Sequence, residues 1–184
     1  GAMAALRHGL LEKKVQLLAE LRKLDEALEL LQPLIDEAAR HAAANPKLIP
    51  VSLQWFQLLQ LQYTLLEQVG DSRTNAAREL YLSAIEERWK ANPEYLALGD
   101  AWLTSRSGVI RSMIRNGEFD AAQKLLDELQ AKQRIVGENE SLKPLVERYA
   151  ATARLLTNNL TGERRRAALV GQPMKSFAGA TWLN

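Results

Sequence analysis

The 184-residue sequence contains no cysteine and only two histidines, His8 and His41. The lack of cysteine excludes disulfides, thiolate nucleophiles and Cys-ligated zinc from this chain. The two histidines are far apart in the sequence and have Ala- or Leu-rich neighbours, so they do not predict a metal site or a Ser-His-Asp relay. We therefore expect no catalytic residue, no cofactor and no metal within this chain.

Glycine and proline are also scarce, with ten and six residues, and no glycine-rich phosphate loop precedes an expected helix. No apolar run reaches the roughly 18 uncharged residues that a membrane span requires. The 24 basic and 22 acidic residues nearly balance, which does not favour a polybasic nucleic-acid surface. This composition is typical of a soluble, helix-rich domain, for which we expect neither a nucleic-acid partner nor a membrane span.

Apolar residues recur at spacings of three and four through successive segments, which predicts an all-α fold of about seven helices. The expected helices cover about 4–21, 24–38, 51–69, 73–89, 93–115, 118–134 and 141–159, and a short stub follows at 163–170. Residues 51–69 are apolar almost all the way round, so this helix must be covered on more than one side. Neighbouring helices could cover it, or it could form the interface of a homodimer.

Several residues are expected to break or start helices. Pro33 removes a backbone hydrogen bond and predicts a kink near Glu29 or a break. Asn92 and Pro93 are expected to be the N-cap and the first position of the fifth helix. Thr161-Gly162 is expected to end the seventh helix.

The turn Gly117-Glu-Phe119-Asp-Ala-Ala122, followed by Leu126 and Leu129, resembles the turn of a tetratricopeptide (TPR) repeat. In this motif the glycine ends one helix in a left-handed cap and the alanine permits close approach of the next helix. Weaker copies occur at 23–27, 70–77 and 162–167. The resemblance implies a TPR-like α-solenoid of antiparallel helix pairs, and the alternative is an irregular helical bundle.

TPR-like stacks line a concave face with the first helix of each pair. On this reading, Tyr63, Tyr95, Trp102 and Arg106 are candidates for a peptide-binding groove, although such a stripe is also typical of a buried core. The resemblance implies a non-catalytic protein-protein interaction or scaffold module. Its partner would be a protein or peptide segment, or an attached C-terminal domain.

The two ends of the sequence differ from its helical part. Residues 1–3 are interpreted as a protease-cleavage remnant, 4–168 as the helical domain and 169–184 as an irregular tail. In the tail, Gly171, Phe177, Trp182 and Asn184 resemble the lead-in of a TlpA/ResA-type thioredoxin-like domain, but Met174-Lys175 replaces the usual Ala-Pro.

The tail resemblance implies that the chain is the accessory helical domain of an exported thiol-disulfide oxidoreductase. The CxxC motif of that enzyme would lie beyond this sequence, and its location would be periplasmic or extracytoplasmic. Without the resemblance, we expect a cytoplasmic protein. In that case the tail would be an ordinary extension that packs Phe177 and Trp182 onto the last helices.

Overall fold

The computed structural model describes residues 2–170, and these residues form seven α-helices, one short 3-10 turn and no strand. The helices are α1 (Ala2–Glu20), α2 (Leu24–Ala44), α3 (Ile49–Val69), α4 (Thr74–Ala91), α5 (Leu96–Arg115), α6 (Phe119–Glu138) and α7 (Lys143–Leu169), with the 3-10 turn η1 (Glu140–Leu142) before α7. The all-α prediction with about seven helices is confirmed. None of the helices in residues 2–170 is long and apolar enough to span a membrane.

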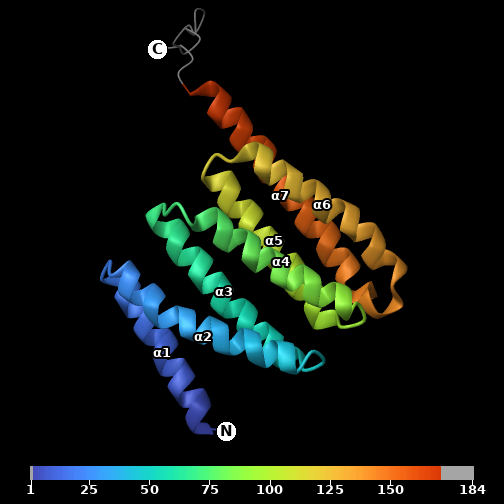
Figure 1. Ribbon diagram of the computed structural model, residues 1–184. Helices are drawn as coiled ribbons and strands as arrows, with labels where there is room; N and C mark the ends of the chain where they lie inside the picture. The colour runs from blue at the N-terminus through green and yellow to red at the C-terminus, as the bar shows by residue number, and fades with distance from the viewer. Residues whose placement is uncertain (1, 171–184) are drawn as a thin grey trace, which may run out of the picture.

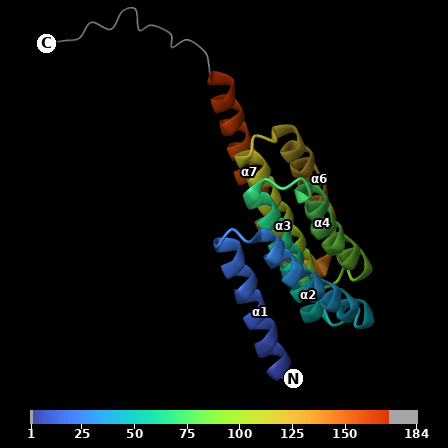
Figure 2. The same ribbon diagram turned by 60° about the vertical axis from the view of Figure 1, so that its left-hand side comes forward.

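The helices are stacked in chain order from α1 to α7, so that the two ends of the described chain lie at opposite ends of the molecule (Figure 1). Each helix packs against the next, and in addition α3 contacts α5 and α5 contacts α7. The view in Figure 2 shows α1 at the edge of the stack. Helix α5 is therefore a direct neighbour of α3 and α7 as well as of α4 and α6.

One continuous apolar core runs through this stack, from Val15 in α1 to Leu160 in α7. Helix α3 lies between α2 and α4 and also contacts α5, which explains why its sequence is apolar on nearly all sides. Phe56, Leu59 and Leu66 of α3 are each no more than 4% exposed. Because neighbouring helices cover these residues, the apolar character of α3 does not require a homodimer.

The helix pairs recur at a constant interval. Helices α3, α5 and α7 begin at Ile49, Leu96 and Lys143, each 47 residues after the one before. Trp55 and Trp102 occupy the same position within α3 and α5, again 47 residues apart. A TPR repeat has 34 residues, so the helix pairs of this chain are longer than those of a TPR.

An asparagine follows the second helix of each pair, at Asn45, Asn92 and Asn139, and is the C-cap of that helix. The side-chain amides of Asn45 and Asn92 donate to the carbonyl oxygens of His41 and Arg88, at 2.9 and 3.1 Å. The prediction that Asn92 caps the start of α5 is therefore wrong. Asn92 instead ends α4, because its amide satisfies a carbonyl group that would otherwise be free.

The turn inside each pair also has a common form. Arg22, Gly70 and Gly117 adopt positive φ angles of 59°, 67° and 79°. The following residue in each turn donates its backbone N–H to a carbonyl five residues earlier, at 2.8, 3.0 and 2.8 Å. This is the Schellman hydrogen bond, which turns the chain after the first helix of each pair.

Two predicted breaks do not occur, and long-range contacts support the helix near each. Helix α2 continues through Pro33, where the flanking Leu31 and Leu34 are buried in the core. Helix α7 continues through Gly162 to Leu169, so the expected fourth turn at 162–167 is not formed. Nη2 of Arg164 anchors this part of α7 to the start of α6 by donating to the backbone oxygen of Phe119, at 3.0 Å.

Candidate functional site

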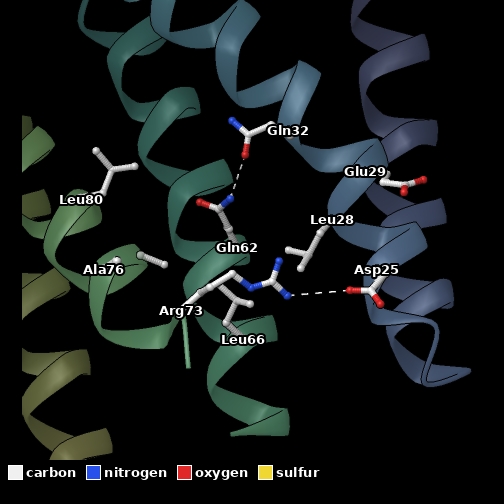
Figure 3. Close-up of a pocket in the computed structure, with 10 residues that line it drawn as sticks. Asp25, Leu28, Glu29, Gln32, Gln62, Leu66, Arg73, Ala76 and Leu80 are labelled. Atoms are coloured by element: carbon white, nitrogen blue, oxygen red, sulfur yellow. Dashed lines mark hydrogen bonds and ion pairs between the residues drawn. The ribbon is translucent and has the colours of Figure 1, made fainter. Parts of the chain in front are cut away.

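An open groove lies between α2 and α4, and the second half of α3 forms its floor (Figure 3). Its volume is about 710 Å³. The lining residues are Asp25, Leu28, Glu29 and Gln32 from α2, Gln62 and Leu66 from α3, and Arg73, Ala76, Ala77 and Leu80 at the start of α4. The groove is thus formed by two consecutive helix pairs.

The floor of the groove is apolar. Leu66 and Ala77 line it and are buried, and Leu28 lines it and is half-buried. Ala76 and Leu80 are exposed on the α4 side, and 48% of the Leu80 surface is accessible. This surface can accept apolar side chains from outside, because burying exposed apolar area is favourable.

The α2 rim of the groove is acidic. Asp25, Glu29 and Asp36 are exposed and follow one another at spacings of four and seven, which places them on one line along the helix. Between them, Gln32 donates to Asp36 at 2.9 Å and accepts a hydrogen bond from Gln62 at 3.1 Å. The carboxylate of Asp25 is 90% exposed.

The α4 rim carries one cation, Arg73, whose charge is already matched. Its Nε and Nη2 donate to the two carboxylate oxygens of Asp71, at 2.9 and 2.7 Å. The side-chain hydrogen bonds from Arg73, with its backbone N–H, lower the pKa of Asp71 to about 2. The nearest oxygen of Asp25 is 3.8 Å from Nη2, across the mouth of the groove (Figure 3). The exposed acids of α2 therefore leave the groove with a net negative charge.

The corresponding place between α4 and α6 is filled by the side chain of Arg78. Counted from the first residues of α2 and α4, Leu24 and Thr74, the buried Ala27 and Ala77 occupy the same position, and the residues that follow them are Leu28 and Arg78. Arg78 is only 11% exposed, and its guanidinium donates to Glu118 at 3.0 Å and to Asn75 at 2.7 Å. A leucine instead of an arginine therefore leaves the first groove open.

The four residues predicted to line a peptide groove lie elsewhere. Tyr63, Trp102 and Arg106 are buried, with 5%, 2% and 6% of their surfaces exposed, and Tyr95 is half-buried just before α5. The structure brings Trp102 and Arg106 together but places Tyr63 in a separate contact with Tyr81, at a centroid distance of 6.4 Å. An open groove formed by these four side chains is therefore not present in the structure.

Trp102 and Arg106 instead belong to a half-buried charge cluster around Glu86. Nη2 of Arg106 lies 2.9 Å from the Glu86 carboxylate, Nζ of Lys132 lies 3.3 Å from it, and the Trp102 indole N–H also donates to it. Burial raises the pKa of Glu86, but the hydrogen bond from Trp102 and the two cations outweigh it, so the pKa lies below its ordinary value. Burial lowers the pKa of Arg106.

This cluster has the contacts of a structural element. Trp102 stacks on Tyr149 at a centroid distance of 5.9 Å, and the Tyr149 hydroxyl donates to the backbone oxygen of Gly99 at 2.9 Å. The cluster thus joins α4, α5, α6 and α7. Nε and Nη1 of Arg106 have no hydrogen-bond partner among the described residues.

Metal ligands do not converge in the described part of the chain: no group of three His, Asp or Glu side chains could hold an ion there. His41 is exposed in the last turn of α2. The tail at 171–184, which carries the thioredoxin-like resemblance, lies outside the described residues, so that interpretation stays a prediction.

The groove residues Asp25, Leu28, Glu29 and Arg73 were not predicted from the sequence as a site. A signal for their arrangement exists, since Ala-Asn-Pro recurs at 44–46 and 91–93 and reveals the 47-residue interval. The 47-residue interval holds for the first helices and for the C-caps, whereas α2 and α4 begin 50 residues apart, at Leu24 and Thr74. Aligning these two helices on their first residues places Leu28 where α4 has Arg78. Comparisons with known protein families, with curated proteins and with solved structures find no match for this chain.

Proposed function

We propose that this chain is a non-catalytic protein-protein interaction or scaffold module of TPR-like type, and that it holds a segment of a partner protein in the groove between α2 and α4. The observation that carries the proposal is the open apolar floor formed by Leu28, Leu66 and Leu80. In a stack of helix pairs, a groove between neighbouring pairs is a common place for peptide recognition.

The turns support the TPR-like part of the proposal. Gly117 has the left-handed conformation that the motif requires, and Ala122, Leu126 and Leu129 are completely buried. Phe119 is packed against the core at the start of α6. The interval of 47 residues is a departure from TPR repeats, and we attribute it to longer helices, which have 18 to 27 residues here.

Site-specific photo-crosslinking tests the proposal. A photoreactive amino acid replaces Ala76, which is exposed at the groove, and the protein is irradiated in its own cells. The matched control places the same residue at Ala121, the equivalent exposed position in α6, where Arg78 fills the groove. We expect a discrete crosslinked protein, identified by mass spectrometry, from position 76 and not from 121. Equal crosslinking at both positions, or none at 76, would contradict the proposal.

A further inference from the structure

We propose that the segment bound between α2 and α4 is basic: it inserts apolar side chains between the two helices and pairs flanking Lys or Arg residues with the acidic rim of α2. This inference rests on the proposed function and specifies the class of its partner. Two features of the structure carry it. One is the unmatched negative charge of the α2 rim, and the other is Arg78, which fills the position in α4 that corresponds to Leu28 in α2.

The first feature is the unmatched negative charge of α2. Asp25 is 90% exposed, and its one ion pair among the described residues is with Nη2 of Arg73, at 3.8 Å. That guanidinium is bound through two hydrogen bonds to Asp71, so it compensates Asp25 only weakly. Glu29, one turn further along α2, is exposed and has no ion pair among the described residues. An incoming ammonium or guanidinium group would find two carboxylates one helical turn apart.

The second feature is Arg78, which fills the equivalent position in the next pair. Its aliphatic stem lies between α4 and α6, and its guanidinium reaches Asn75 and Glu118. Asn75 is the counterpart of Asp25, because each lies two residues before the equivalent buried alanine, Ala77 or Ala27. Between α4 and α6, a guanidinium group of the chain itself thus fills the position that is empty between α2 and α4. A partner can supply a Lys or Arg side chain to this empty position.

Two synthetic peptides test the sign of the charge. Both carry leucines at positions i, i+3, i+4 and i+7, which suit a groove between helices, and they differ only in flanking lysines or flanking glutamates. Fluorescence anisotropy measures their affinity for the purified chain at low and at high salt. We expect the lysine peptide to bind at least about 10-fold more tightly at low salt, and this advantage to shrink as salt screens the charges. Equal affinity, or tighter binding of the glutamate peptide, would overturn the inference.

Variants of the chain then place the binding in the groove. Asp25→Lys with Glu29→Lys should reverse the preference of the two peptides. The control is Glu94→Lys with Glu138→Lys, which changes the net charge by the same amount. These two exposed residues lie just after α4 and at the C-terminal end of α6, so the control should leave the preference for the lysine peptide unchanged. If the control reverses it as well, the peptides respond to overall charge and the inference is wrong.

Leu28→Arg provides a third variant, which should close the groove as Arg78 closes the next one. It should reduce the affinity for the lysine peptide at least about 10-fold, because it occupies the floor and pairs with Asp25. Circular dichroism and urea unfolding verify that the variant remains folded, and Ala76→Arg provides a second, exposed way to block the groove. If both folded variants still bind the lysine peptide as tightly as the wild type, the peptide does not bind in the groove between α2 and α4.

The crosslinking and peptide experiments separate the two proposals. A partner crosslinked from position 76, together with no preference for the lysine peptide, leaves the proposed function standing and rejects the basic partner. No crosslink from 76 and no peptide binding rejects both. A crosslinked partner whose contact segment carries glutamates or aspartates instead of Lys or Arg would also reject the inference.

Discussion

The guanidinium carbon of Arg106 lies 4.1 Å from the centre of the Trp102 ring, while Nη2 of the same arginine lies 2.9 Å from Glu86. Arg106 is therefore held by a cation-π contact on one face and by a carboxylate at its end. The side chain is only 7% exposed, so Glu86 is its main compensating charge. This dependence on a single carboxylate leads to the first prediction.

Replacing Glu86 with glutamine should destabilise the fold strongly. Glutamine keeps the size and one acceptor of the side chain but leaves the buried charge of Arg106 without an opposite charge, which typically costs about 3 kcal/mol. Urea unfolding measures the free energy of unfolding from the midpoint and the slope. The control is Glu87→Gln, at the adjacent exposed position, which should change the free energy by less than about 0.5 kcal/mol. Similar losses in both variants would show that Glu86 has no special role.

The same carboxylate predicts how stability depends on acid pH. The pKa of Glu86 is below its ordinary value of 4.5 in the folded state, so the unfolded chain takes up this proton first as the pH falls. The stabilisation from Glu86 is thus present above the unfolded pKa and is lost as the pH falls through the folded pKa. The difference in unfolding free energy between the wild type and Glu86→Gln should therefore shrink between about pH 6 and about pH 3. A difference that stays constant over this range would contradict the prediction.

Local patterns were sufficient to predict the helices but not every helix end. Spacings of three and four residues place the apolar stripe of a helix, and Gly70 and Gly117 end helices because they readily adopt a positive φ. Pro33 and Gly162 have the same local chemistry as true breaks. Long-range contacts support the helix at both places: Leu31 and Leu34 are buried beside Pro33, and Arg164 of α7 donates to the start of α6. These contacts are not encoded in the nearby residues.

The site was harder to predict for a related reason. Aromatic residues such as Tyr63 and Trp102 occur both in cores and in grooves, and only the arrangement of the helices decides that both are buried here. Conversely, the groove is open because of a residue that looks unremarkable, Leu28. Its importance becomes visible only by comparison with Arg78, which lies at the same distance from the start of α4 as Leu28 does from the start of α2.

Two glycines of α5 should respond in opposite ways to alanine. Gly108 is exposed within the helix, and an added methyl group would meet no atom within 4 Å, so Gly108→Ala should stabilise the fold by about 1 kcal/mol. At Gly99 the same methyl group would lie 2.9 Å from Leu145 of α7 and 3.3 Å from Trp89 of α4, where α5 packs against both helices. Gly99→Ala should therefore lower the melting temperature, whereas Gly108→Ala should raise it. A rise for Gly99→Ala would show that this contact can relax at little cost.

The last prediction concerns the turn between α1 and α2. Arg22 has a φ of 59°, a conformation that costs a residue with a side chain about 1 kcal/mol or more, while the equivalent turns have Gly70 and Gly117. Arg22→Gly should therefore stabilise the fold, even though glycine increases the entropy of the unfolded chain. Gly117→Ala should destabilise it by about 1 kcal/mol, because a methyl group there would meet no neighbour within 4 Å and only the backbone strain would count. Arg22→Ala is the control that removes the arginine side chain without relieving the strain. If it stabilises the fold as much as Arg22→Gly in urea unfolding, the gain comes from losing the arginine and not from the backbone.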